Sequence, residues 1–317
     1  MTSSGGPLAA SVAGLAFRNP IVLAAGTAGY GHELSGVIDL DGVGGFVTKA
    51  VSMEPRLGAP APRVAEFEGG MINAVGLANP GVKVVCAEHL PWLATHHLGT
   101  RRFANIVGFS IEEFGSVIAG LEHAMIGSNQ PALDGFELNV SCPNVKAGGM
   151  EFGSDVNSLS AVVSTSRRAT KRLLFVKLSP TVPDIGAMAR VAADAGADGI
   201  TVINTIPGLV IDLEGRRPGL GFGTGGVSGP AILPVGVLAT WKVHGAVTLP
   251  IIGVGGVSSA ADALQYIVAG ATLVGVGTAA LRDPRQPERI AADLAIWCRA
   301  HGVQSLSDLR GTLEWPA

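Results

Sequence analysis

Eight short apolar runs alternate along the chain with segments of helical periodicity, and this alternation limits the possible folds more than any other feature. The runs span residues 21–25, 45–51, 103–109, 135–141, 173–179, 199–205, 250–254 and 273–277. The helical patterns span residues 32–40, 82–96, 111–126, 156–169, 184–195, 230–244, 260–269 and 287–300. Strands that are each followed by a helix form a parallel sheet, and eight such units close into a (β/α)8 or TIM barrel. The sequence therefore predicts an α/β protein with this barrel.

An open, doubly wound sheet is the alternative, but it requires a glycine-rich GxGxxG turn after the first strand. Residues 25–29 read AGTAG, which is a poor match. Residues 8–17 predict a short hairpin that closes the amino end of the barrel. Two excursions, 54–80 and 207–229, leave from carboxyl ends of strands, where barrel enzymes place their sites. Their Gly and Pro content predicts ordered loops over a pocket, with mobile surface loops as the alternative. No linker divides the chain, so we expect one domain over residues 1–317.

The composition narrows the setting in which the protein works. Of 317 residues, 47% are apolar and 15% are charged, which allows a large core. Glycines interrupt the most apolar stretches before they reach the roughly 18 residues of a transmembrane helix, so we expect no membrane span. A net charge of −3 without a basic stripe argues against nucleic acid as a partner. The chain start lacks a secretory pattern and the three cysteines form no CxxC pair, which predicts a cytoplasmic protein.

Polar residues stand where the predicted strands end. In chain order they are Lys49, Asn105, Asn139 with Cys142, Lys177, and Asn204 with Thr205. Two of the six lysines therefore lie inside apolar strand patterns, and burying an ammonium group without a partner is costly. Either lysine alone is compatible with a paired structural role. Two at one barrel mouth favour an anionic or electron-rich ligand.

The last two strands end in glycine-rich turns, GVGGVSS at 253–259 and GVGT at 275–278. Backbone N–H groups in such turns bind phosphate, and barrels often use this position. Tight packing turns are the structural alternative, and any phosphate-bearing ligand, including a sugar phosphate, fits the pattern. Lys177 favours one ligand, because a cation at the middle of the mouth would stabilise a reduced, anionic flavin ring. A phosphate at one side and a ring over the barrel centre describe FMN.

Residues 135–150, reading GFELNVSCPNVKAGGM, hold the most reactive side chain of the predicted mouth. Pro143 ends the strand and leaves Cys142 at the start of a polar loop. A thiol between two amides, Asn139 and Asn144, suits a planar polar molecule. A buried, inert cysteine at a turn is the alternative.

A series of motifs runs through nearly the whole chain. They are NPIVLAAG at 19–26, VTKA at 47–50, PRVAE at 62–66, GMINAVGLANPG at 70–81, ELNVSCPNVKAGG at 137–149, VKLSP at 176–180, AGADGITVINT at 195–205 and TGGVSGPA at 224–231, together with 105–108, 250–257 and 275–278. In this order they resemble the class 1 dihydroorotate dehydrogenases. The NVKAGG continuation after the cysteine resembles the B-type, which uses NAD and works with an electron-transfer subunit.

The resemblance implies oxidation of (S)-dihydroorotate to orotate in de novo pyrimidine (UMP) biosynthesis, with FMN as hydride acceptor and Cys142 as the base. The implied substrate contacts are Lys49, Asn73, Ala74, Val75, Gly76, Leu77, Asn139, Asn144, Asn204 and Thr205. The implied contacts to one FMN per chain are Ala25, Lys49, Ala50, Asn105, Asn139, Lys177, Ile203, Gly229, Gly255, Gly256, Gly277 and Thr278. Lys146 would lower the pKa of the thiol if it lies close, and Gly148 and Gly149 would let the cysteine loop act as a lid. No metal ligand is predicted.

The B-type resemblance also implies a homodimer core with a partner subunit that carries FAD and a 2Fe–2S cluster, in a heterotetramer that reduces NAD+. The chain has no cysteine cluster that would hold such a centre. One departure concerns Ala25, which replaces a serine usual in B-type relatives, so only its backbone would contact flavin. Three alternatives stay open: a homodimer that uses fumarate, a flavin enzyme for another dihydropyrimidine, and a phosphate-binding scaffold without activity.

Overall fold

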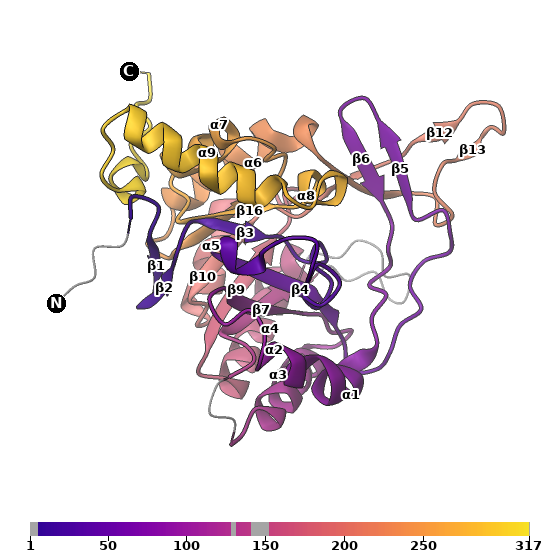
Figure 1. Ribbon diagram of the computed structural model, residues 1–317. Coiled ribbons are helices and arrows are strands. Elements are labelled where there is room, and N and C mark those ends of the chain that lie inside the picture. Colours follow the sequence, from indigo (N-terminus) through magenta and orange to yellow (C-terminus); the bar gives the residue numbers. More distant parts are fainter. Residues whose placement is uncertain (1–5, 128–130, 141–151, 317) are drawn as a thin grey trace.

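The computed structural model describes residues 6–127, 131–140 and 152–316, and at its centre eight parallel strands form a closed barrel (Figure 1). In chain order these strands are β3 Ile21–Leu23, β4 Gly45–Val51, β7 Arg101–Ile106, β8 Gly135–Asn139, β9 Leu173–Leu178, β10 Gly199–Val202, β15 Ile251–Val254 and β16 Leu273–Val276. The last strand pairs with the first, Val274 opposite Ile21, and this pairing closes the ring. The barrel prediction is confirmed, and the open sheet is excluded.

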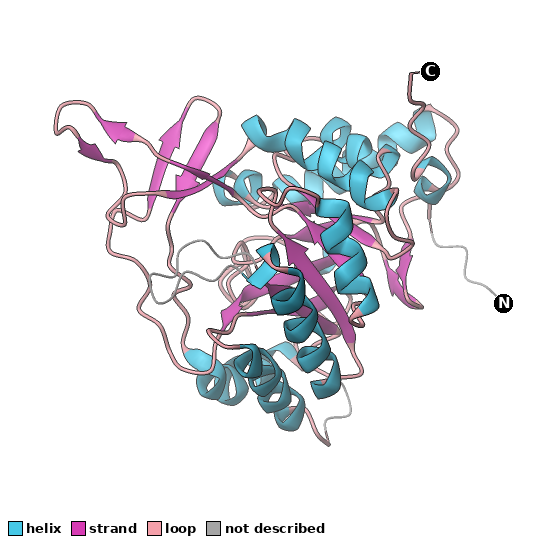
Figure 2. Ribbon diagram, turned by 180° about the vertical axis from the view of Figure 1, so that it is seen from behind, coloured by secondary structure: helices cyan, strands magenta, loops and turns pink. Residues whose placement is uncertain are grey.

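Helices surround the strands on the outside (Figure 2). They include α3 Ile111–Ala124, α4 Val156–Ala169, α5 Ile185–Asp194, α6 Leu233–His244, α7 Ala260–Val268 and α9 Gln286–Ala300, and the short α8 Thr278–Arg282 was not predicted. The side chains of Ser110, Asp155, Asp184 and Ser259 accept backbone N–H groups at the starts of α3, α4, α5 and α7. Such caps satisfy N–H groups that have no partner within a helix. None of the described helices is long and apolar enough to cross a bilayer.

The first two helix predictions differ from the structure. Residues 32–40 form turns that lead into a 3₁₀ turn, η1 Leu40–Gly42, and not a helix. Gly31 and Gly36 have φ of 102° and 86°, values that an α-helix does not contain. The pattern at 82–96 is helical but divided into α1 Gly81–Val84, the π turn η2 Val85–His89 and α2 Leu90–Leu93. Pro91 lacks the N–H of a regular α-helix, which explains a change of hydrogen bonding beside it.

The two excursions were predicted as loops, but together they build a sheet. β5 Val64–Phe67 and β6 Gly70–Asn73 come from the first, and β11 Ile206–Gly208 and β14 Gly225–Ser228 come from the second. Their order is β11-β14-β6-β5, and all neighbours are antiparallel. A separate hairpin of β12 Ile211–Asp212 and β13 Arg217–Pro218 projects from the second excursion. Figure 1 shows these strands at the end of the molecule opposite the chain's amino-terminal hairpin.

The predicted amino-terminal hairpin is confirmed as β1 Ala10–Val12 and β2 Leu15–Phe17. Its Val12 and Phe17 are buried in one cluster with apolar residues from six barrel strands. The ring of Phe17 stacks on Phe103 with centroids 6.3 Å apart, and Phe103 meets Phe175 edge to face at 5.6 Å. Aromatic and aliphatic side chains therefore fill the amino end of the barrel. Polar chemistry has to take place at the carboxyl end, as in other barrels of this kind.

Candidate active site

The first predicted strand-end residue, Lys49, lies on β4, which is bonded to the turn that follows β3. Lys49 is partly buried, and its backbone N–H donates to the carbonyl of Gly29 at 2.7 Å. The Tyr30 hydroxyl donates to the carbonyl of Ala50 at 2.8 Å. Burial is the main cause that raises the pKa of Tyr30, with a contribution from Glu33, so the phenol stays protonated. The turn that contains Ala25 is thereby held against the strand that contains Lys49 and Ala50.

A buried polar network lies in the barrel interior, above the apolar cluster. Asn105 Nδ2 donates to Glu137 Oε1, and Thr201 Oγ1 donates to Glu137 Oε2, each at 2.9 Å. All three residues are at most 2% exposed. Glu137, which is bonded to the predicted site residue Asn105, was not itself predicted. The signal was present, because a charged residue inside an apolar strand pattern requires partners.

Lys177 lies on β9 between two polar neighbours, Asn139 on β8 and Thr201 on β10. It is 8% exposed, so its ammonium group belongs to the barrel interior. Asn204 Nδ2 donates to Asn139 Oδ1 at 3.2 Å, and Asn204 Oδ1 accepts the backbone N–H of Thr205 at 2.9 Å. Ile203 beside them is buried. The structure thus brings the predicted residues of β8, β9 and β10 together at one mouth.

The glycine turns that follow β15 and β16 lie on neighbouring strands. Gly255 and Gly256 have φ of 133° and 75°, and a capping box at Ser259 starts α7 immediately after them. Tyr266 donates its hydroxyl to the carbonyl of Gly255 at 2.6 Å. Gly277 caps α8 directly after β16. Backbone N–H groups ahead of two helix starts are a suitable donor set for a phosphate group.

The β11-β14-β6-β5 sheet is connected to the glycine turns that follow β15 and β16. Thr278 Oγ1 donates to Ser228 Oγ at 2.8 Å, which links the start of α8 to β14. Gly229 follows β14 with φ of 99°, and a Cβ there would lie 2.8 Å from the Cα of Gly70. Only glycine allows the two excursions to approach this closely.

The predicted substrate segment, residues 73–77, leaves β6 towards the end of β4. Asn73 Nδ2 donates to the carbonyl of Gly226 at 3.3 Å. Ala74 is buried, Val75 is 36% exposed, and Gly76 and Leu77 have φ of 71° and 57°. Asn79 holds the far end of the segment: its Nδ2 donates to the carbonyl of Leu77, and its Oδ1 accepts the N–H of Ser52 beside β4. Asn79 was not predicted, although it lies within the GLANPG motif.

Comparison with known proteins identifies the family. A family model described as dihydroorotate dehydrogenase matches residues 7–296. The chain belongs to the dihydroorotate dehydrogenase family. A relative from Pelobacter propionicus named "dihydroorotate dehydrogenase B (NAD(+)), catalytic subunit" is 47% identical over 96% of this chain and 97% of its own. One from Geobacter sp. (strain M21) with the same name is 43% identical over 97% and 98%. The resemblance to B-type catalytic subunits is confirmed.

Two further matches complete the comparison. A Solibacter usitatus protein named for the fumarate-linked A type is 45% identical over 97% of this chain and 99% of its own. The crystal structure of the dihydroorotate dehydrogenase of Eimeria tenella in complex with ferulenol has a TM-score of 0.81. It covers 98% of this chain and 90% of its own at 22% identity, so it supports the barrel fold alone.

Several predicted residues of this dihydroorotate dehydrogenase family member lie outside the described residues. They are Cys142, Asn144, Lys146, Gly148 and Gly149. Close to the two ends of this gap, the N–H of Gly153 donates to the carbonyl of Val140 at 2.9 Å. The role of Cys142 is therefore a proposal that starts from the sequence.

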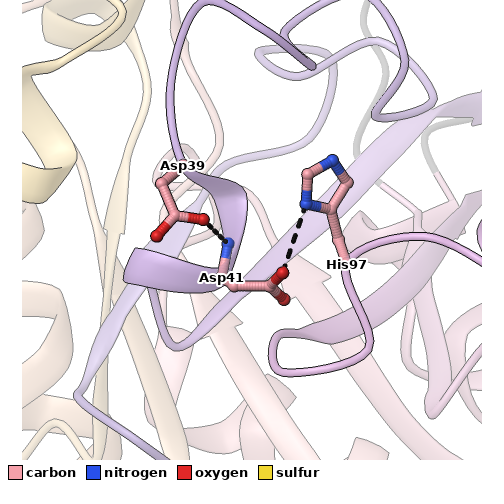
Figure 3. A group of neighbouring side chains, drawn as sticks. All are labelled: Asp39, Asp41 and His97. Atoms are coloured by element: carbon pink, nitrogen blue, oxygen red, sulfur yellow. Dashed lines mark hydrogen bonds and ion pairs between the residues drawn. The ribbon is translucent and has the colours of Figure 1, made fainter.

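A group of Asp39, Asp41 and His97 lies away from the predicted site residues and contains potential metal ligands (Figure 3). Its two carboxylates have structural hydrogen-bond partners. Asp39 accepts the backbone N–H of Asp41 at 3.0 Å, and Asp41 accepts that of Gly99 at 2.8 Å. His97 Nδ1 lies 3.5 Å from an Asp41 carboxylate oxygen. These contacts fasten η1 to the loop before β7.

We expect the Gly256→Ala substitution to lower the free energy of unfolding of the flavin-free protein. The residue has φ of 75°, and an added Cβ would lie 2.7 Å from the backbone nitrogen of Leu233. Left-handed strain and overpacking together predict a loss of about 2–5 kcal/mol. Urea unfolding measures it. Gly277→Ala is the matched control, because its Cβ would meet only Ala24 at 3.7 Å. Equal losses in the two variants would contradict the prediction.

Proposed function

We propose that this protein oxidises (S)-dihydroorotate to orotate in the de novo biosynthesis of pyrimidines, in the cytoplasm, with FMN as its cofactor. The single observation that supports this most is the convergence of Lys177, Asn105, Asn139 and Asn204 at the barrel mouth, beside two glycine turns. Relatives that carry the name of the B-type catalytic subunit match this chain over nearly its whole length.

The residues present fit FMN in their chemistry. The glycine turns after β15 and β16, with Gly229 and Thr278, would hold the phosphate through N–H groups and a hydroxyl. Asn105, Asn139, Lys49 and Lys177 would surround the ring at the middle of the mouth, and the backbone at Ala25, Ala50 and Ile203 would complete its contacts. When bound, FMN supplies an acceptor for a hydride. The Lys177 ammonium would stabilise negative charge on the electron-rich group beside it.

Cys142 would act as the base in the oxidation. It takes a proton from C5 of dihydroorotate while a hydride leaves C6, so the substrate loses two hydrogens and gains a C5–C6 double bond. An unperturbed thiol with a pKa of about 8.5 is a suitable base near neutral pH. Closure of the loop around Gly148 and Gly149 over the substrate would keep water from the reacting atoms.

Amide side chains would recognise the substrate. Dihydroorotate has ring carbonyls, ring N–H groups and a carboxylate, and amides supply both donors and acceptors for such a set. Asn139, Asn204 and Thr205 come from the strand ends, Asn73 to Leu77 from the end of β6 and the segment after it, and Asn144 from the cysteine loop. Lys49 would pair with the substrate carboxylate or with the flavin.

The final electron acceptor is proposed to be NAD+, reached through a partner subunit with FAD and a 2Fe–2S cluster. The name "catalytic subunit" of the relatives implies a further subunit for them. Two copies of this chain and two partner subunits would form a heterotetramer. The A-type name of one relative favours a second candidate, in which a homodimer passes electrons to fumarate.

The absorbance spectrum tests this function directly. We expect the purified chain to be yellow, and the flavin band to bleach when dihydroorotate is added without oxygen. A colourless protein that never takes up FMN would refute the proposal. Bleaching by a dihydropyrimidine without the carboxylate, as fast as by dihydroorotate, would indicate a different substrate. NAD+ reduction that requires a co-purified subunit would support NAD+ as the final acceptor. Fumarate reduction by the chain alone would support fumarate.

A further inference from the structure

Glu137 is a buried carboxylate to which the proposed reaction gives no role. It is 2% exposed, and both of its oxygens have partners on other strands of the barrel. Oε1 accepts from Asn105 Nδ2 on β7, and Oε2 accepts from the Thr201 hydroxyl on β10, each at 2.9 Å. The interior cluster on the amino side of the barrel is apolar and includes Phe103 and Phe175, and Phe175 pairs in register with Glu137. Packing alone therefore does not require a charge at this position.

Burying a carboxylate has an energetic cost, and an apolar residue of similar volume is often at least as stabilising. Glu137 and Lys177 both point into the barrel. Thr201, whose hydroxyl reaches Glu137, pairs in register with Lys177, so these two share the inner face. Glu137 pairs in register with Phe175, two residues before Lys177 on β9. The carboxylate thus lies one layer below the cation that is proposed to face the flavin.

The chemistry of a carboxylate determines how its neighbours are oriented. An ionised carboxylate only accepts hydrogen bonds, whereas an amide and a hydroxyl can each donate or accept. The Asn105 amide must therefore turn its Nδ2 towards Glu137, and this leaves its Oδ1 and its second N–H for a ligand. The Thr201 hydroxyl must likewise point its hydrogen towards Glu137. Without the carboxylate, the Asn105 amide is free to turn over.

We propose that Glu137 is a positioning residue for the cofactor, which sets the direction of the Asn105 amide and lowers the reduction potential of the flavin. This inference rests on the proposed FMN function. The negative charge of Glu137 opposes the negative charge that reduction adds to the flavin ring. The positive charge of Lys177, which lies nearer the ring, stabilises that added charge. The reduction potential of the flavin would therefore depend on the balance between these two buried charges.

A double-mutant cycle on the flavin-free protein tests the proposal. FMN is titrated into wild-type, Glu137→Gln, Asn105→Ala and the double variant, and binding is followed by flavin fluorescence. A glutamine keeps the shape but can donate to Asn105 Oδ1, so the amide can turn over. We expect Glu137→Gln to weaken FMN binding about tenfold, the effect of one hydrogen-bonding group facing the wrong way. In the Asn105→Ala background it should change binding less than about twofold, because the residue it acts through is gone.

The reduction potential of the flavin is a second measurement. If Glu137 had only a structural role, its replacement would not be expected to shift this potential in a defined direction. We expect the flavin potential of Glu137→Gln to be more positive than that of the wild type. Equal weakening in both backgrounds, or an unchanged or more negative potential, would overturn the proposal. Thermal unfolding without flavin shows whether the variant folds. If Glu137→Gln does not fold, Glu137→Met, which also removes the carboxylate and keeps the volume, replaces it throughout the cycle with the same expected outcomes.

The FMN titration of the wild-type protein distinguishes failure of the proposed function from failure of the proposed role of Glu137. A wild-type protein that does not bind FMN refutes the proposed function. A wild-type protein that binds FMN, together with Glu137 variants that bind it equally well, refutes the role of Glu137 alone.

Discussion

The Cys142→Ala variant is expected to oxidise dihydroorotate 10²- to 10⁴-fold more slowly than the wild type, the range over which a positioned base accelerates a proton transfer. Alanine removes the group that accepts the C5 proton and leaves nothing of similar basicity in its place. Because the predicted flavin contacts do not include Cys142, FMN should stay bound with an unchanged spectrum. Bleaching of the flavin band in single-turnover mixing without oxygen measures the rate of this step without the partner subunit.

Cys86→Ala is the matched control for this prediction. Cys86 lies on η2, and its Sγ is 3.7 Å from the carbonyl of Gly120 on α3. Burial raises the pKa of this thiol, so it remains protonated and inert. We expect its rate to stay within about twofold of the wild type, as for a substitution away from a catalytic position. A Cys142→Ala variant that retained more than a tenth of the wild-type rate would remove the cysteine from the mechanism.

The Lys177→Met variant is expected to lose affinity for FMN and to lower the reduction potential of the flavin that it binds. Methionine keeps an unbranched chain out to Cε and removes the charge that would stabilise the reduced ring. A loss of about 1.4–2.8 kcal/mol corresponds to roughly 10- to 100-fold weaker FMN binding. If the reduced form loses about 1.4–2.8 kcal/mol more than the oxidised form does, the two-electron potential drops by about 30–60 mV. Titration with FMN and equilibration with a reference dye measure the two quantities.

Lys83→Met provides the comparison, because Lys83 lies exposed on α1. It should bind FMN as the wild type does and with the same potential. Unfolding curves of both flavin-free variants separate an effect on the cofactor from an effect on the fold. Wild-type affinity and potential in Lys177→Met would show that the cation does not face the flavin.

The barrel could be predicted from the sequence because each of its strands is a local apolar run and six of its helices are local periodic patterns. The convergence of the strand-end residues could be predicted too, because parallel strands bring their carboxyl ends to one edge of the barrel. The prediction extended six of the eight strands by one to three residues at that edge, whereas β4 and β15 end where predicted. β10 ends at Val202, so Asn204 and Thr205 lie beyond the ladder, where they make side-chain contacts.

Features that depend on distant residues were not predictable in this way. The β6–β14 pairing joins residues of two excursions that each look like a glycine-rich loop on their own. The prediction of a helix at 32–40 was wrong because hydrophobic periodicity does not reveal the positive φ of Gly31 and Gly36. Glu137 was visible as an anomaly, but its partners lie on two other strands. Only the closed barrel brings these three residues together.

The β6–β14 pairing also has a consequence for the order of folding. Asn73 and Gly226, which are bonded across it, are 153 positions apart in the chain. Contacts of such long range carry a large loop-closure entropy unless other structure has already brought the two segments together. The four-stranded sheet should therefore form after the barrel and open before it, as a cooperative unit of lower stability. Because β6 leads into the predicted substrate segment, mild denaturant would abolish turnover while the barrel is still closed.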